Sequence, residues 1–202
     1  MNKKDQCNTC FSYKYKNETE EKWKIHVANK EKARKAKTTD KELAEKGKIV
    51  AVTMDLQAVK LAPFLPARKI YFKTKLCCHN FTLYNLATRD VTCYWFSEDQ
   101  NNQLQASTFT SCIIDLLEKN CLTPDKLPII IYSDGCGFQN KNNILSNAIL
   151  NFSIKHQIFV YQKYLEPCHT QMKCDSVHSI IERKLRHREI HLPSDYAYVT
   201  KD

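Results

Sequence analysis

Three aspartates stand where they could bind metal ions together. Asp55 follows the β-branched run "KIVAVTM", and Asp134 follows "PIIIYS" and precedes a Gly-Cys-Gly turn. Both runs predict short strands that end at a carboxylate. Asp175 comes early in a predicted basic helix. Carboxylate oxygens suit Mg²⁺ or Mn²⁺, and two such ions about 4 Å apart could activate a water or a 3′-hydroxyl for phosphoryl transfer.

Each aspartate also has an ordinary structural interpretation. Asp134 before Gly135 is common in turns, Asp55 could cap a strand end, and Asp175 could cap its helix. Carboxylates at neighbouring strand ends repel each other unless cations hold them, so the three together favour a two-metal site. Glu182 competes with Asp175 as the third acid. We prefer Asp175 because it lies at the helix start.

The segment "EPCHTQMKCDSVHSIIERK" adds histidines and cysteines to the acids. His169 and His178 are candidates to contact the scissile phosphate or to orient an attacking water. Together with Cys168 and Cys174 they are also zinc-ligand types, although this spacing is not usual for a zinc finger. Both interpretations are open from the sequence.

The N-terminal "CNTC" places Cys7 and Cys10 in a two-cysteine knuckle. A zinc site needs two further ligands. His26 is the nearest candidate, and no fourth ligand is evident in the sequence. The knuckle is either half of a zinc site or a chance pair. The ten cysteines are scattered and accompany no secretory signal, which predicts reduced thiols.

The charge balance favours a polyanionic partner such as DNA. The chain has 31 Lys and Arg against 22 Asp and Glu, a net charge of +9. Two groups are candidates for contacting phosphates: Gln139, Asn140 and Lys141 after the turn, and Arg183, Lys184 and Arg186 on the last helix. The first group could instead align Asp134 or cap a helix, and the second could be a solvated helix face.

The elements that position these residues follow from hydrophobic periodicity. Residues 1–47 hold the knuckle and a charged helix over 14–46, and 48–202 form the main domain. Strands are predicted in 48–57, 67–86, 91–97, 129–132 and 157–165, and helices in 102–120, 143–156 and 173–189. This βββαβαβα order predicts an α/β mixed sheet with helices on both faces. It is typical of the ribonuclease-H-like fold, in which the first and fourth strands are neighbours.

Several other classes of protein lack their required parts. With only three glycines, the chain has no P-loop and no dinucleotide-binding fingerprint, and it has no G-x-S-x-G elbow. No apolar stretch approaches the roughly 18 residues of a membrane span, and no signal peptide is evident. We therefore expect an intracellular protein without a membrane partner. Basic residues between Lys30 and Lys37 could face DNA or act as a weak nuclear address.

In combination, "MDLQ", "YSDGCGFQNKNN", "EPCHTQMKCDSVHSIIERK" and "IHLPSDYAYV" resemble the uncharacterised DUF7869 domain of transposon-derived animal proteins. The resemblance spans nearly the whole chain and implies a ribonuclease-H-like transposase core, nuclear and DNA-binding. The acidic positions it implies are Asp55, Asp134 and Asp175, and the other matching motif positions are Gly135, Gln139, Asn140, His169 and Glu182. The chain departs from the family at Phe138 and Cys168, where members often have glycine.

These observations predict a metal-dependent nuclease or transposase domain that cleaves or joins DNA phosphodiesters. The alternative is an inactive, domesticated module that binds nucleic acid or uses zinc in an interaction. The DNA sequence, a homo-oligomeric state and whether the chain is a fragment are left open.

Overall fold

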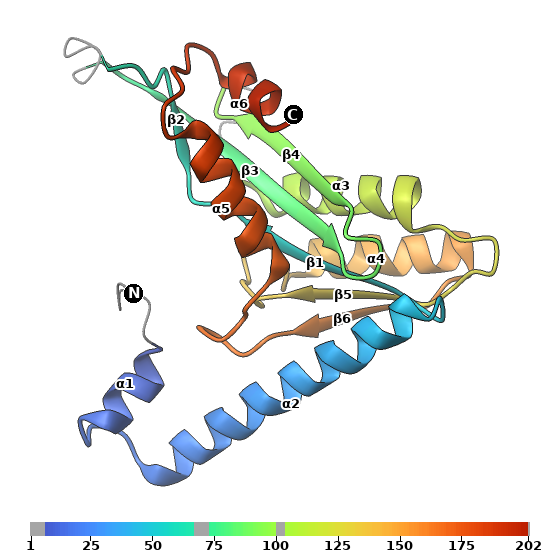
Figure 1. The fold of residues 1–202 in the computed structure, drawn as a ribbon. Coiled ribbons are helices and arrows are strands. Elements are labelled where there is room, and N and C mark those ends of the chain that lie inside the picture. Colours follow the sequence, from blue (N-terminus) through green and yellow to red (C-terminus); the bar gives the residue numbers. More distant parts are fainter. Residues whose placement is uncertain (1–6, 67–72, 100–103, 202) are drawn as a thin grey trace.

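The computed structural model describes residues 7–66, 73–99 and 104–201 (Figure 1). The strands are β1 (Val50–Leu56), β2 (Lys60–Ala62), β3 (Leu76–Asn85), β4 (Val91–Ser97), β5 (Ile129–Ser133) and β6 (Val160–Tyr164). The helices are α1 (Asn8–Lys14), α2 (Glu20–Glu45), α3 (Ala106–Leu116), the π-helical η2 (Leu117–Cys121), α4 (Asn143–His156), α5 (Lys173–Leu185) and α6 (Pro193–Lys201). No helix within these ranges is long and apolar enough to cross a membrane.

All six strands form one mixed sheet. Strand β1 lies between β3, to which it is antiparallel, and β5, to which it is parallel. Strand β6 is parallel to β5 at one edge, and β3 pairs antiparallel with both β2 and β4. The predicted α/β class is therefore confirmed, as is the predicted neighbourhood of the first strand and the strand at 129–132.

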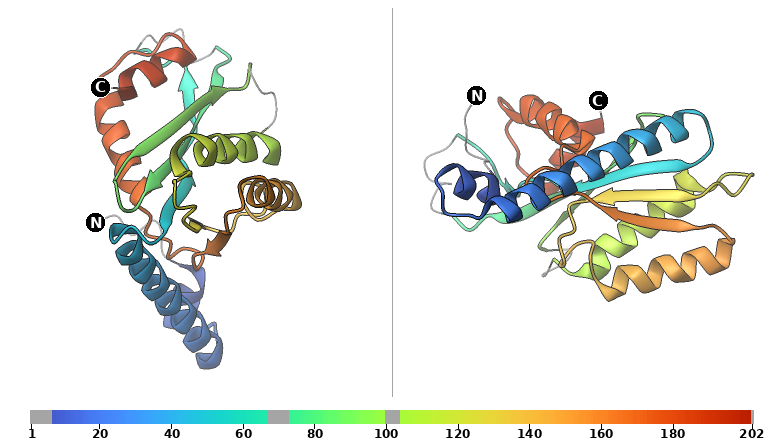
Figure 2. Two further views of the ribbon diagram at one scale, coloured as in Figure 1. Left: turned by 90° about the vertical axis from the view of Figure 1, so that its right-hand side faces the viewer. Right: turned by 90° about the horizontal axis from the view of Figure 1, so that it is seen from below.

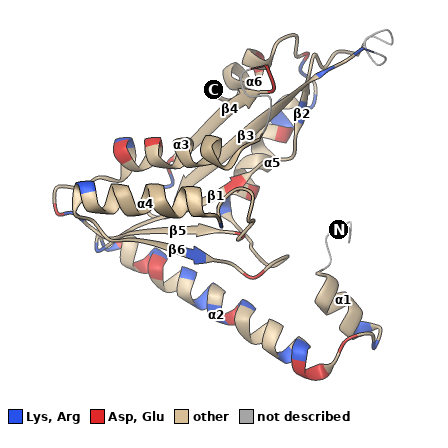
Figure 3. Cartoon of the chain, turned by 180° about the vertical axis from the view of Figure 1, so that it is seen from behind, with Lys and Arg blue, Asp and Glu red and all other residues tan. Residues whose placement is uncertain are grey.

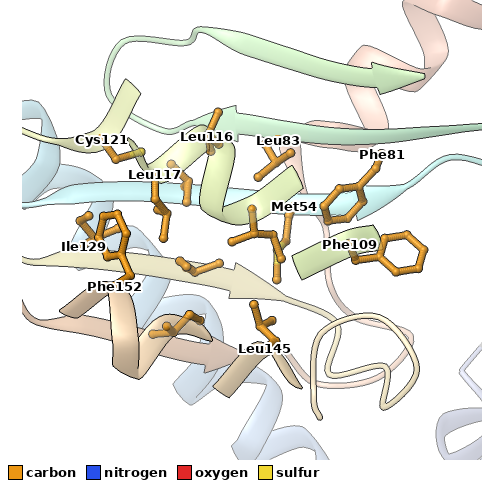
Figure 4. Packing of buried hydrophobic residues seen from close by; sticks show 14 of the residues in the cluster. Met54, Phe81, Leu83, Phe109, Leu116, Leu117, Cys121, Ile129, Leu145 and Phe152 are labelled. Atoms are coloured by element: carbon orange, nitrogen blue, oxygen red, sulfur yellow. The ribbon is translucent and has the colours of Figure 1, made fainter. Parts of the chain in front are cut away.

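Helices cover both faces of the sheet, as the sequence predicts (Figure 2). Helices α3 and α4 pack on one face over the main apolar cluster, which includes Met54, Phe81, Phe109, Leu145 and Phe152 (Figure 4). Side chains alternate along each strand, so the two faces receive different residues of the same strand. Ile129 and Ile131 of β5 join that cluster, whereas Ile130 and Tyr132 point to the other face.

The long helix α2 is anchored on this second face near its C-terminal end. Ala44 packs in the apolar cluster that contains Ile130 and Tyr132. The buried Asp40 accepts a 2.6 Å hydrogen bond from the Tyr132 hydroxyl and pairs with Lys163 of β6. The rest of α2 carries charges of both signs (Figure 3), several of which pair along the helix, as in Lys24 with Glu20 at 2.7 Å. Much of its basic charge is thus balanced locally.

The observed elements differ from the expected ones at a few places. The helix expected over 14–46 is observed as α2, which begins later, where the Thr19 hydroxyl accepts from the Lys22 amide at 3.4 Å, and the separate short helix α1 precedes it. It ends just before Gly47, whose positive φ of 67° favours glycine. Strand β2 and helices α1 and α6 were not predicted. Residues 67–72 of an expected strand and 102–103 of an expected helix lie outside the described residues.

Candidate metal sites

Asp55 and Asp134 lie at the ends of adjacent parallel strands. The register of β1 and β5 pairs Thr53 with Tyr132, two residues before each aspartate. Met54 points to the cluster beneath α3 and α4, so Asp55 points to the opposite face, where α5 packs. The carboxyl end of a sheet is where α/β proteins place ligand sites.

Helix α5 brings two further side chains to Asp55. The ligand atoms of Asp55, Asp175 and His178 all lie within 4.8 Å of one another. Asp175 and His178 are three residues apart and therefore share one face of the helix. His178 places Nδ1 3.9 Å from a carboxylate oxygen of Asp55 and Nε2 3.1 Å from the hydroxyl of Thr82 on β3.

A buried cysteine fixes α5 above these strands. The Cys174 thiol lies 3.6 Å from the backbone carbonyls of both Thr53 and Thr82. Its burial raises the pKa of Cys174 to about 12, so it is a neutral packing group. Asp175 follows it and is exposed to solvent, which leaves the acidic group open to a substrate.

The acidic group is electrostatically unfavourable without a cation. Burial, followed by the charges of Asp175 and Asp134, raises the pKa of Asp55 to about 7. Burial also lowers the pKa of His178, although Asp175 and Glu182 oppose that shift. The local excess is therefore negative, and a divalent cation would relieve the repulsion. Oxygen donors with one imidazole fit Mg²⁺ or Mn²⁺ better than a soft metal.

Asp134 is oriented by the turn that follows β5. Its Oδ1 accepts hydrogen bonds from the Cys136 amide at 3.0 Å and from Asn140 Nδ2 at 2.8 Å. Gly135 has a φ of 75°, and a Cβ there would lie 3.4 Å from the Tyr164 ring, so the turn requires glycine. Asp134 influences Asp55 electrostatically but lies outside the 4.8 Å group.

Asn140 is a positioning residue. It is only 2% exposed, and its backbone carbonyl accepts from Gln162 Nε2 at 3.1 Å and from the Tyr164 hydroxyl at 3.3 Å. Its own Oδ1 is buried and has no hydrogen-bond partner among the described residues. Of the two functions that the sequence allowed for this residue, the contacts match alignment of Asp134 rather than binding of phosphate.

Glu182 is engaged elsewhere on α5. It accepts a hydrogen bond from Gln57 Nε2 at 2.8 Å and pairs with Lys60. Although burial opposes the shift, these two partners lower the pKa of Glu182. The buried Gln57 is itself held by Asn80 at 2.9 Å. Asp175 is thus the acid of α5 that joins the 4.8 Å group with Asp55.

The candidate phosphate-binding residues are mostly exposed. Arg183, Lys184 and Arg186 lie on the solvent side of α5, and Lys141 places its ammonium 5.4 Å from the Tyr164 ring. Gln139 is half-buried in the turn. A groove of about 340 Å³ between β2, α5 and the segment before α6 is lined by Lys60, Glu182 and Arg186 together with apolar side chains.

His169 lies in a second cluster, with Cys7, Cys10 and His26. The four ligand atoms all lie within 4.8 Å of one another. Cys7 Sγ is 3.3 Å from His26 Nε2, and Cys10 Sγ is 3.5 Å from His169 Nε2. The sequence identified three of these residues but placed His169 at the acidic site. The alternative zinc set of Cys168, His169, Cys174 and His178 is not brought together within the described ranges.

The environment of this cluster favours the neutral, metal-binding form of the His169 imidazole, whereas it favours the thiol of Cys10, which must release its proton when a metal binds. Burial, followed by neighbouring His26, lowers the pKa of His169 and keeps its imidazole neutral. Burial, followed by Cys7, raises the pKa of Cys10, because two adjacent thiolates repel without a cation. All ten cysteines lie in described segments and none forms a disulfide.

No protein-family model, curated protein or solved structure matches the chain. The resemblance to DUF7869 therefore stays a prediction.

Proposed function

We propose that residues 48–202 form a ribonuclease-H-like domain of transposase type, which cleaves or joins DNA phosphodiesters with two Mg²⁺ or Mn²⁺ ions. The observation that carries this proposal is that Asp175 lies within 4.8 Å of Asp55 and that Asp134 follows the strand paired with β1. Burial and the charges of both acids raise the pKa of Asp55 to about 7. Purely structural carboxylates are more often stabilised by nearby cationic side chains or hydrogen-bond donors.

The strand arrangement supports the fold assignment. Neighbours across the sheet run β4, β3, β1, β5 and β6, with β2 beside β3. Three antiparallel strands are followed by parallel strands joined through helices, the arrangement expected of ribonuclease-H-like domains. The resemblance to DUF7869 supports the same assignment, and with it a nuclear, transposon-derived protein.

Each of these residues would have a distinct role in the proposed reaction. Asp55 is influenced by the charges of both other acids and would contribute to both ions, whereas Asp134 and Asp175 would each hold one. The buried imidazole of His178 would orient the attacking water or 3′-hydroxyl. Bound Mg²⁺ would supply an activated nucleophile and stabilise the leaving oxygen. Asn140 would keep Asp134 in its orientation throughout.

Positive charge on α5 supports a nucleic-acid substrate. Arg183 and Lys184 lie in the last turn of α5 and Arg186 is its C-cap, on the same helix as Asp175 and His178 but at its other end. Phosphate contacts from such side chains position a duplex without reading its sequence. The second candidate function is an inactive module that binds nucleic acid or uses zinc in an interaction, which the cluster containing Cys7 and Cys10 favours.

Calorimetric titration of Mn²⁺ into the zinc-replete protein tests the proposal without knowledge of the DNA target. We expect saturable binding of two ions that is lost in Asp55→Asn and reduced to one ion in Asp134→Asn. The matched control is Asp125→Asn, which removes an exposed carboxylate in a turn and should leave binding unchanged. Mn²⁺-dependent cleavage of plasmid DNA should be lost in the same variants. A folded parent that binds no Mn²⁺ would favour the inactive module.

A further inference from the structure

The distances in the cluster of Cys7, Cys10, His26 and His169 match those between the ligands of one zinc ion. Zn–S bonds of about 2.3 Å and Zn–N bonds of about 2.0 Å at tetrahedral angles place sulfur and nitrogen about 3.5 Å apart. The two measured sulfur–nitrogen pairs are 3.3 Å and 3.5 Å. No pair of ligand atoms exceeds 4.8 Å, so the ligand atoms of a pair need to approach each other by about 1.5 Å at most.

The outer contacts are those of a metal-bound histidine. His26 directs Nε2 toward Cys7, and its Nδ1 donates to a carboxylate oxygen of Glu166 at 2.8 Å. A carboxylate behind a zinc-binding imidazole fixes its tautomer and strengthens it as a ligand. Two thiolates with two imidazoles select zinc over Mg²⁺ or Ca²⁺ in ligand type. The group at Asp55 instead offers carboxylate oxygens and one imidazole and contains no thiolate.

The N-terminal helix needs such a support. Helix α1 has seven residues and no buried residue, and its Phe11 and Tyr15 are 47% and 56% exposed. Helices this short are unstable without tertiary contacts. Tyr13 of α1 stacks on Trp23 of α2, with ring centroids 4.3 Å apart. This contact joins α1 only to the neighbouring helix. The contact of Cys7 with His26 also joins α1 to α2, whereas the contact of Cys10 with His169 joins α1 to the segment between β6 and α5.

We propose that Cys7, Cys10, His26 and His169 form a structural zinc site that joins α1 and α2 to the segment between β6 and α5. Helix α2 already contacts this segment, since Lys37 donates to the backbone carbonyl of Gln171 at 2.7 Å. The zinc site adds a second attachment near the other end of the helix. With all four ligands from the protein the site is closed, which is the arrangement of structural rather than catalytic zinc. The inference does not depend on the proposed nuclease activity.

Zinc content of the purified full chain, measured by inductively coupled plasma mass spectrometry, tests the site directly. We expect one zinc per chain in the parent and at least a tenfold lower affinity in His169→Ala and Cys10→Ser. The matched control is Cys168→Ser, which changes the exposed neighbour of His169 and should keep one zinc. His169→Cys should also keep zinc, because Cys₃His is a common structural set.

Two further measurements keep the proposal testable if a ligand variant fails to fold. Glu166→Gln leaves all four ligands in place and should weaken zinc binding about 10- to 100-fold. Co²⁺ substitution of the parent should give thiolate charge-transfer bands and the visible bands of tetrahedral cobalt. A folded parent without zinc that gives no such bands would overturn the proposal. So would a Cys7–Cys10 disulfide in the freshly purified protein, or zinc retained in His169→Ala but lost in Cys168→Ser.

Discussion

Replacing Asp55 with asparagine should remove a pH-dependent loss of stability. The pKa of Asp55 rises from 3.8 to about 7 on folding, and its side chain is 22% exposed. A difference of about 3 pKa units, at about 1.4 kcal/mol per unit, corresponds to about 4 kcal/mol. Between these two pKa values the folded state holds a proton that the unfolded state has released. The free energy of unfolding therefore falls as pH rises from about 4 to about 7.

Asparagine has nearly the same shape as aspartic acid but does not titrate in this range. At pH 4 the parent and Asp55→Asn should have similar stability, because Asp55 is protonated in the fold. At pH 8 and without added divalent cation, the variant should be more stable by up to about 4 kcal/mol. Urea unfolding of both proteins between pH 4 and pH 8.5 measures the difference in their free energies of unfolding. Titrating groups that the two proteins share contribute equally to both values and therefore cancel in this difference.

The matched control is again Asp125→Asn, which makes the same carboxyl-to-amide change at an exposed turn away from the acidic group. A constant difference between the parent and Asp55→Asn across this range would refute the electrostatic account of the site. The same assay tests the cation. Mg²⁺ at 100 times its dissociation constant should stabilise the parent at pH 8 by about 2.7 kcal/mol and leave Asp55→Asn unchanged.

Three further substitutions probe the surroundings of the acids. Asn140→Ala removes the 2.8 Å hydrogen bond to Asp134 and should destabilise the fold by about 1–3 kcal/mol and weaken Mn²⁺ binding, as measured by urea unfolding and calorimetry. Glu182→Gln should change the free energy of unfolding by under about 1 kcal/mol, because the pair of Glu182 with Lys60 is half-exposed. The variant should also retain Mn²⁺ binding. Loss of Mn²⁺ binding would instead make Glu182 the third acid. Arg186→Ala should weaken DNA binding by a similar factor on every sequence and lower the salt slope of log K by about 1, measured by fluorescence anisotropy at several salt concentrations.

Local signals were sufficient for the elements beside the acidic site. The range predicted for β4 is the observed one, since a β-branched and aromatic run lies between polar turns. The predicted bounds of α4 are also observed, because Asn142 caps its first turn at 3.0 Å and Gln157 ends it in the left-handed region. The neighbourhood of β1 and β5 followed from element order. Asp55 and Asp134 could therefore be identified as neighbours before any geometry was known.

The cysteine-histidine cluster could not be assembled in the same way. Cys10 and His169 are 159 residues apart, and no periodicity in the sequence connects them. The only signal in the sequence was that the two cysteines of the knuckle needed two further ligands. His26 was the nearest candidate for one of them, and several histidines could have supplied the other. Helix α6 is different, because its sequence contained a usable signal. Asp195 accepts from the amides of His191 and Leu192 at 2.9 Å and 3.0 Å, next to a proline at the first helical position.

The segment between β6 and α5 connects the two candidate metal-binding groups. It contains His169 of the cysteine-histidine cluster and leads directly to Asp175, whose carboxylate accepts a 3.0 Å hydrogen bond from the Met172 amide. Asp55 and Asp134 end paired strands and are held by the sheet, whereas Asp175 depends on this segment and on the packing of Cys174. Because oxygen ligands suit hard cations and thiolates suit zinc, each group would select its own metal. The zinc site would then support the acid that the sheet itself does not position.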